Sequence, residues 1–230
     1  MKTPPIPGIR AIAAAALLVV ATAPAHAVEA FTANYHASAM GMQGQGQMTV
    51  APQGDNRWQY SLSVKNQVVD LSQKTIFDEH NGQLRPLSSS DNSRVLIKKK
   101  AVDTVYDWSK AQASWSGDVK PDRAGPIKLQ PGDMDALLVN LAIVRDVAAG
   151  RKPLSYRMVE SGRAKNMTYQ VSGKEKVTIA GKAHDATKVV RTDGDKQTIV
   201  WVVADIPVPA RILQRENGQD AIDLTLTTWR

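Results

Sequence analysis

Three histidines between residues 28 and 230 are the side chains best suited to metal binding or proton transfer: His36, His80 and His184. His80 follows Asp78 and Glu79, so three potential metal ligands are consecutive in the chain. Consecutive side chains of a strand point to opposite faces, whereas ligands four residues apart on a helix converge on one ion. Asn81-Gly82, a pair typical of hairpin turns, comes next. We therefore interpret this run as a solvated hairpin and predict no metal site.

The chain carries hydroxyl and imidazole groups, but not in an arrangement known for nucleophilic catalysis. His184-Asp185 could pair a general base with an orienting carboxylate, yet no nucleophile lies in a recognisable sequence frame. Ser88-Ser89-Ser90-Asp91 lacks the Gly-x-Ser-x-Gly elbow and is typical of a connector before a strand. The chain has no cysteine, which excludes thiol nucleophiles and thiolate metal ligands. We identify no catalytic residue.

Asp133 and Asp135 could be the two carboxylates of a glycoside hydrolase. They stand at the start of a helical pattern, however, and helical residues two apart point to different sides. Asp133 is expected to accept hydrogen bonds from the first helical turn, and Asp135 suits the positive end of the helix dipole. We predict that both stabilise the helix and do not act on a substrate.

Two further clusters have one structural and one functional interpretation each. Met40, Met42 and Met48, separated by glycines, resemble loose copper(I)-binding methionine clusters, but no histidine lies nearby. Turn and strand packing explains them better, and we expect no bound cofactor. Lys98-Lys99-Lys100, close to Arg94, is either a charged edge that prevents sheet-to-sheet aggregation or a contact for acidic lipid or glycan head groups.

The N-terminal segment has the features of an export signal. Lys2 and Arg10 precede the apolar run Ala11 to Ala23, and Ala25-His26-Ala27 fits the small-x-small cleavage pattern. We predict a signal peptide over residues 1–27 and a periplasmic mature chain of one domain over residues 28–230. After Ala23 no apolar run reaches the roughly 20 residues of a membrane-spanning helix. The scattered net charge of +7 does not indicate nucleic-acid binding.

One amphipathic helix is predicted in the mature chain, over residues 133–149, ending at Gly150. Its apolar stripe consists of Met134, Leu137, Leu138, Leu141, Val144 and Ala148. Almost everything else alternates with the period of a strand, as in Trp58-Gln59-Tyr60-Ser61-Leu62, and Ser93 to Lys99 is expected to be strand throughout. Ile199 to Val203 is apolar on both faces and is expected to be covered on both.

A lone helix must bury its stripe against a sheet. The sequence therefore predicts a mainly β fold, a curved antiparallel sheet or partly closed barrel with helix 133–149 on its concave face. This order of elements is similar to the lipoprotein-carrier type of fold, by analogy alone.

The second half of the chain also resembles domain-of-unknown-function family 3108, a family of exported bacterial proteins. The matching pieces are Asp133-x-x-x-Leu137-Leu138-x-x-Leu141-x-x-x-Arg145, Ser161-Gly162-Arg163, Thr178-Ile179-Ala180-Gly181, Ala186-Thr187-Lys188-Val189, Trp201-Val202-Val203-Ala204-Asp205 and Pro209-Ala210-Arg211-Ile212. The resemblance implies a periplasmic, mainly β protein with one central helix. It implies no reaction, because the family pattern has no catalytic signature to transfer.

We interpret the chain as a non-catalytic periplasmic binding or carrier protein for an apolar or amphipathic envelope molecule, such as a lipid. The ligand-binding residues predicted for it are Trp58, Tyr60, Tyr106, Trp108, Leu137, Leu138, Leu141 and Trp201. Aromatic residues at alternating strand positions are more often core than ligand site. The alternatives are a structural or protein-interaction module of the cell envelope and, third, an enzyme acting on envelope glycan or lipid with polar groups around His80 or His184.

Overall fold

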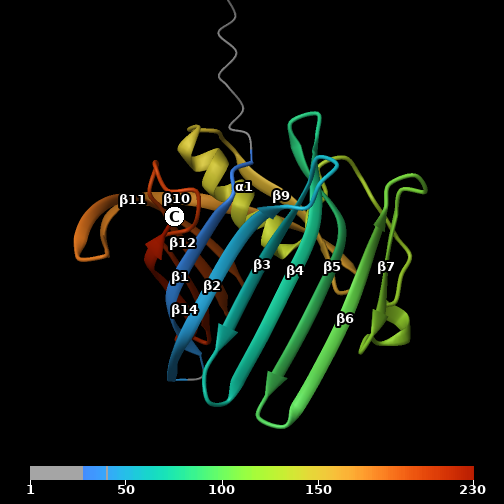
Figure 1. Cartoon of the computed structure of the whole chain (residues 1–230), viewed down its shortest axis with the longest axis horizontal. Helices are drawn as coiled ribbons and strands as arrows, with labels where there is room; N and C mark the ends of the chain where they lie inside the picture. Colours follow the sequence, from blue (N-terminus) through green and yellow to red (C-terminus); the bar gives the residue numbers. More distant parts are fainter. Residues whose placement is uncertain (1–27, 40) are drawn as a thin grey trace, which may run out of the picture.

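The computed structural model describes residues 28–39 and 41–230. The predicted signal peptide, and Met40 of the methionine cluster, lie outside these residues. The described chain forms one antiparallel sheet of 14 strands in the order β8-β7-β6-β5-β4-β3-β2-β1-β14-β13-β12-β11-β10-β9 (Figure 1). The first eight strands are β1 (Phe31–Ala39), β2 (Met42–Pro52), β3 (Arg57–Lys65), β4 (Val69–His80), β5 (Gln83–Val95), β6 (Lys98–Asp107), β7 (Gln112–Gly117) and β8 (Ile127–Lys128).

The chain crosses from one edge of the sheet to the other between β8 and β9. The crossing segment includes a single turn of 3-10 helix, η1 (Pro121–Arg123), and the helix α1 (Ala136–Ala148). The strands that follow are β9 (Leu154–Glu160), β10 (Arg163–Ile179), β11 (Lys182–Asp193), β12 (Lys196–Val202), β13 (Arg211–Glu216) and β14 (Gln219–Trp229). Pairing of β1 with β14 joins the two meanders into one sheet. No helix in the described part of the chain is long and apolar enough to span a membrane.

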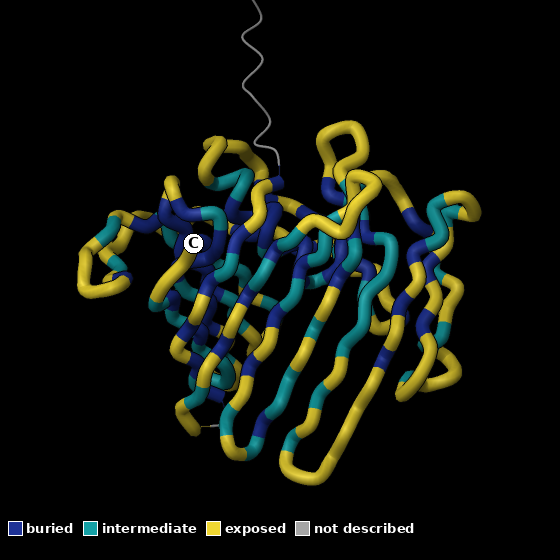
Figure 2. Tube along the Cα trace, in the orientation of Figure 1, coloured by how far each residue is buried: buried dark blue, intermediate teal, exposed yellow. Residues whose placement is uncertain are grey.

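The alternation of side chains explains why the sheet curves around α1. In β1, Phe31, Ala33, Tyr35 and Ala37 are buried, while the intervening residues are exposed or half-buried. Leu138 and Ile143 of α1 are fully buried in the same core, and the helix contacts β3, β4, β5, β9 and β12. In Figure 2 the buried residues are more frequent toward the end of the sheet that carries α1 than at the turns at the bottom of the view. The predicted architecture, a curved antiparallel sheet with one helix on its concave face, is confirmed.

The two ends of this sheet differ, and we name them by what they carry. The helix end holds α1 and the turn between β4 and β5. The hairpin end holds the turns β1–β2, β3–β4 and β5–β6, at the bottom of Figure 1.

The sheet does not close, but side chains and the crossing segment fill the gap between its edges. Met134 N donates to Arg157 O over 3.1 Å, and Val159 N donates to Met134 O over 2.8 Å. Tyr106, from β6 on the opposite side of the gap, donates its hydroxyl to Val159 O over 3.0 Å. Residues of β9 are therefore tied to the far meander without strand pairing.

Two local expectations are wrong. Ser93 to Lys99 is not one strand, because Leu96 and Ile97 form the turn between β5 and β6. Neither residue is a usual turn former, so the sequence contains no turn signal here and the alternation of apolar and polar residues continues through the turn. Ser88 to Asp91 is not a connector either: it lies inside β5, where the pairing with β4 is continuous from Ser88 to Val95.

β12 pairs with residues Thr187–Asp193 of β11, so the part of the β10–β11 hairpin nearer its turn extends beyond β12. This extended part bends over the outer face of the sheet, where the His184 ring lies 6.4 Å from the Trp229 ring of β14. Ile199 to Val203 are all buried. The prediction that this strand is covered on both faces is confirmed.

Candidate ligand-binding site

The start of α1 is fixed by Asp135, not by Asp133 as expected. Asp135 is the N-cap residue and accepts a hydrogen bond from Leu138 N over 2.9 Å, which satisfies a first-turn donor. The Thr75 hydroxyl of β4 donates to the other carboxylate oxygen. At the C-terminal end, Gly150 has a φ of +65° and stops the helix as predicted.

Asp133 has a different role: it holds the crossing segment against β9. Its carboxylate forms an ion pair with Arg157 Nη1 over 2.5 Å and accepts from Gln130 N over 2.8 Å. Asp133 is 1% exposed, and its Oδ1 has no hydrogen-bond partner among the described residues. This ion pair positions α1 relative to the edge strand.

An apolar groove of about 350 Å³ runs along one side of α1 at the helix end. Its apolar walls come from the start of the described chain, from α1 and from the loop after β12. They include Val28, Phe31, Leu141, Val144, Ala148, Ile206 and Pro207. Glu29, Arg145 and Asp205 supply the charged groups. The volume lies in the range typical of small-molecule sites.

A second hollow of about 340 Å³ involves α1 as well and is more polar. Arg145, Arg151 and Arg157 contribute to it, together with Tyr156 and Asp146. Each arginine has a carboxylate partner: Arg145 pairs with Glu79 over 2.9 Å, Arg151 with Asp146 over 3.1 Å, and Arg157 with Asp133. A guanidinium has five N–H donors, so one ion pair leaves it capacity to bind another anion.

Arg145 is the residue that lines both the groove and the hollow. Its side chain is 13% exposed and is held by Glu79, which also accepts from Val28 N over 3.3 Å. The arrangement thus places apolar walls beside guanidinium groups that are each paired with a carboxylate and retain further N–H donors. Such a site suits a molecule with an apolar part and an anionic part.

The family model described as "Protein of unknown function (DUF3108)" matches residues 31–226. The chain belongs to this family. No curated protein shows significant similarity to it.

Three solved structures are similar to this DUF3108 chain at low sequence identity, and the likeness reaches a TM-score of 0.53 in the first of them. A beta-barrel-like protein of domain of unknown function DUF1849 from Brucella abortus is 10% identical, with a TM-score of 0.53, covering 87% of this chain and 96% of that one. The Pseudomonas aeruginosa MucA/MucB complex gives 12% identity, a TM-score of 0.37 and coverage of 87% and 51%. A structure of MucB alone is 11% identical, with a TM-score of 0.35, and the match covers 87% of this chain and 52% of that one. This chain spans about half of the MucB chains, and the DUF1849 likeness concerns the fold alone.

The aromatic and helix residues predicted to bind a ligand lie in three places in the DUF3108 chain. Tyr60, Leu137, Leu138 and Leu141 are buried in the main core, and Trp58 packs against that core half-buried. Only Leu141 of this group lines the groove described above.

Tyr106 and Trp108 lie in the second, smaller core cluster, with Val159. The Trp108 indole donates to Pro86 O over 2.6 Å, and the guanidinium of Arg85 lies 5.8 Å from its ring centroid. Tyr106 is buried and bridges to β9 through its hydroxyl. Tyr106 therefore spans the gap between the sheet edges, whereas the polar contacts of Trp108 are with β5.

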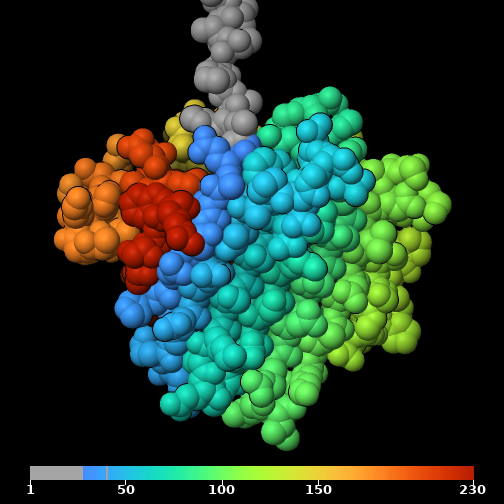
Figure 3. Space-filling model, in the orientation of Figure 1, coloured from blue at the N-terminus to red at the C-terminus, as the bar shows by residue number. Residues whose placement is uncertain are grey.

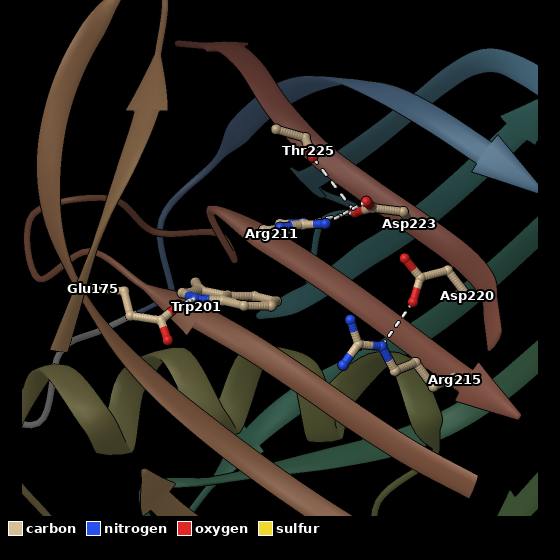
Figure 4. Close-up of polar contacts among 7 residues, drawn as sticks. All are labelled: Glu175, Trp201, Arg211, Arg215, Asp220, Asp223 and Thr225. Atoms are coloured by element: carbon tan, nitrogen blue, oxygen red, sulfur yellow. Dashed lines mark hydrogen bonds and ion pairs between the residues drawn. The ribbon is translucent and has the colours of Figure 1, made fainter. Parts of the chain in front are cut away.

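Trp201 is counted in the main core cluster as well, but its ring contacts charged side chains on the outer side of the sheet. Its ring is 4.9 Å from the Arg211 guanidinium and 5.5 Å from the Lys188 ammonium. Its indole donates to Glu175 Oε2 over 2.7 Å, as Figure 4 shows. The polar contacts of Trp201 are thus with side chains of β10, β11 and β13, not with α1.

The residues considered for metal or acid–base chemistry remain apart from the groove. His36 and His80 are exposed, and His184 is half-buried beside Trp229. In residues 28–39 and 41–230, no group of three or more histidine, cysteine or carboxylate side chains is placed to hold a metal ion.

Sequence reasoning missed that Asp135, at the start of α1, lies near two carboxyl groups of the sheet, Asp91 of β5 and Glu160 of β9. Burial raises the pKa of Asp135 to about 6. Burial, and then the neighbouring charges of Asp91 and Asp135, raise the pKa of Glu160 to about 7. Gln73 donates to Asp91 over 2.7 Å, and burial raises the pKa of that carboxyl as well. These carboxyl groups can hold a proton near neutral pH. For Asp91 the sequence signal was a polar residue at an inward position of β5, opposite Gln73 of β4.

Proposed function

We propose that this DUF3108 chain is a non-catalytic periplasmic carrier or binding protein for an amphipathic envelope molecule with an anionic group. The observation that carries the proposal is the meeting of the apolar groove and the arginine-lined hollow at Arg145. The apolar part of the ligand would lie along Leu141 and Val144, and its anionic part would contact Arg145.

The physical chemistry of the two hollows supports this class of ligand. Apolar walls favour a hydrocarbon group by removing its surface from water. Guanidinium groups bind carboxylate and phosphate through paired N–H donors. An uncharged apolar ligand would make no use of the remaining N–H donors of the arginines, and a purely ionic ligand would make no use of the apolar walls of the groove. A lipid with an anionic head group combines both requirements.

The predicted signal peptide gives the proposed compartment. If cleavage follows Ala27, the new α-ammonium group of Val28 stands beside Glu79, at the entrance of the groove. An ammonium group there would add a second cation to the Glu79–Arg145 pair. The groove is therefore completed by processing in this proposal.

Native mass spectrometry of the protein purified from the periplasm, followed by solvent extraction, tests the proposal directly. We expect a bound species of lipid mass that is released on unfolding. A matched pair of variants locates it. Ala148→Trp places an indole in the groove, whereas Ala149→Trp adds the same ring at the next helix position, which does not line the groove.

We expect Ala148→Trp to lose the bound species and Ala149→Trp to retain it. Both positions are exposed, so neither change should unfold the protein. Wild-type protein that carries no lipid after purification and binds no added lipid probe would contradict the carrier proposal. Recovery of one stoichiometric protein partner instead, unaffected by Ala148→Trp, would favour the alternative of an envelope interaction module.

A further inference from the structure

The turn between β5 and β6 exposes two large apolar side chains. Leu96 is 62% exposed and Ile97 is 93% exposed, the highest values among the large apolar residues that the structure describes. They lie at the hairpin end, where the turn projects at the bottom of Figures 2 and 3. Removing such residues from water requires a partner outside the chain.

The folding of the turn does not explain these residues. Leu96 has a φ of +55°, a conformation that favours glycine or asparagine and strains a branched side chain. Two other hairpin turns contain the expected residues at positive φ, Asn81-Gly82 and Asn217-Gly218, and where Ala111, Ser161 and Ala180 adopt positive φ the side chain is small. The β5–β6 turn therefore carries leucine and isoleucine at the expense of turn stability. Strain of this kind is typical of functional positions.

Basic side chains surround the two apolar residues. Lys98, Lys99 and Lys100 follow the turn, are exposed, and form no ion pair with another described residue. Arg94 precedes the turn and shares Asp70 with Lys65, at 3.4 and 3.8 Å. We call residues 94–100 the β5–β6 tip. Its positive charges are largely uncompensated.

We propose that the β5–β6 tip binds the surface of an anionic phospholipid membrane. Leu96 and Ile97 would enter the boundary between head groups and acyl chains, and the lysines would contact lipid phosphates. Apolar residues flanked by lysine or arginine are the combination that holds a protein segment in this boundary. The anionic surface supplies the charge that Lys98 and Lys99 lack within the chain.

This inference is independent of the ligand proposed above. The tip lies at the hairpin end, whereas the groove and the hollow lie at the helix end. Membrane contact through the tip would hold the protein with α1 directed away from the bilayer.

Vesicle co-sedimentation tests the charge contribution. Wild-type protein should bind vesicles of phosphatidylcholine with 30% phosphatidylglycerol, bind pure phosphatidylcholine weakly, and dissociate as salt is raised. Lys98→Gln with Lys99→Gln should lower the partition constant roughly 25-fold, about fivefold per lysine. Lys100 is left in place because it lies near the Asp91 carboxylate.

The control removes the same charge from another hairpin. Lys174→Gln with Lys182→Gln, at exposed positions of the β10–β11 hairpin, should change binding less than about twofold. An equal loss in both double variants would show general attraction of a basic protein and would overturn the proposal. Equal binding to both kinds of vesicle would overturn it too.

A fluorescent label tests insertion. Since the chain has no cysteine, Ile97→Cys carries an environment-sensitive dye at one position, and Lys182→Cys is the matched control. We expect a blue shift and quenching by bilayer-embedded quenchers for the label at 97 alone. Ile97→Ser should also lower binding roughly tenfold. A label at 97 that stays in water on bound protein, or full binding by Ile97→Ser, contradicts the inference.

Discussion

The helix end and the hairpin end of the sheet bury different kinds of side chain. At the helix end, Phe77 and Tyr60 are fully buried, and the inner face is continuous with Leu138 of α1. Toward the hairpin end, β4 and β5 turn polar on this face, with Gln73 and Asp91 half-buried at inward positions. Buried apolar residues such as Ala37 and Val64 continue there in β1 and β3, so the core thins toward this end mainly at β4 and β5. Changes at the two ends should differ in size and in sign.

The largest effect is expected where α1 fills the core. Leu138→Ala removes a fully buried side chain and should lower the free energy of unfolding by about 3–4 kcal/mol. Leu71→Ala, at a half-buried inward position of β4 at the hairpin end, should cost less than about half as much. Urea denaturation followed by tryptophan fluorescence measures both. Equal losses would show that the hairpin end is packed as tightly as the helix end.

The next effect is a pH dependence that originates at Asp135. Its pKa is about 6 in the folded chain, against an ordinary value of 3.8. The folded state therefore binds this proton more tightly than the unfolded state, so stability is highest below pH 4 for this group and falls as pH rises toward 6. The difference corresponds to at most about 3 kcal/mol.

Asp135→Asn tests this directly because asparagine also caps helices well. The variant should lose the fall in stability between pH 4 and 6 while keeping α1 folded. Denaturation midpoints at several pH values, compared with wild type, give the slope. Wild-type stability that instead rises steadily over this range would show that Asp135 is ionised without penalty. Protonation of exposed carboxylates such as Asp193, whose pKa is lowered first by Lys165, adds the opposite trend at lower pH.

A smaller loss is expected where the crossing segment meets β9. Asp133→Asn removes the charge that Arg157 pairs with and should cost about 2 kcal/mol, since the carboxylate is buried and the arginine is partly exposed. Lys110→Gln removes an exposed partner of Asp107 and should change stability by less than about 0.5 kcal/mol. Thermal unfolding compares the two. A neutral Asp133→Asn would mean that α1 is positioned by its apolar stripe alone.

The differences between sequence and structure follow the same division. The alternation of apolar and polar residues predicted the sheet, and the apolar stripe with Leu137 and Leu141 predicted the helix. Both predictions work because buried apolar residues recur in the sequence with the period of the element. The cap residue was misplaced by two positions, since Asp133 and Asp135 are equally good caps and only the contacts with Arg157 and Thr75 separate them.

The groove could not be predicted, because it depends on three segments far apart in the chain that meet at Arg145. Residues such as Tyr106 and Trp201 looked alike in sequence but lie in different environments, the gap and the outer face. Alternation tells which residues share a face of one strand. It does not tell how a long hairpin such as β10–β11 bends over another face, or which strands meet across an open edge.

The smallest effect should have the opposite sign, and it concerns the turn that sequence reasoning took for strand. Leu96→Gly relieves a left-handed conformation and removes an exposed apolar side chain, so it should raise the free energy of unfolding by about 1 kcal/mol. Ile97→Ser, at a position that is 93% exposed and not in that conformation, should stay within about 0.5 kcal/mol.

Urea denaturation and vesicle binding, measured on the same Leu96→Gly protein, separate the two demands on this turn. Greater stability together with weaker membrane binding would mean that Leu96 serves contact with the membrane and lowers the stability of the fold. Lower stability would instead show that Leu96 packs usefully against the neighbouring β3–β4 turn, to which its N–H donates at Val68 O over 2.7 Å. The hairpin end would then resemble the helix end, with its residues chosen for the fold.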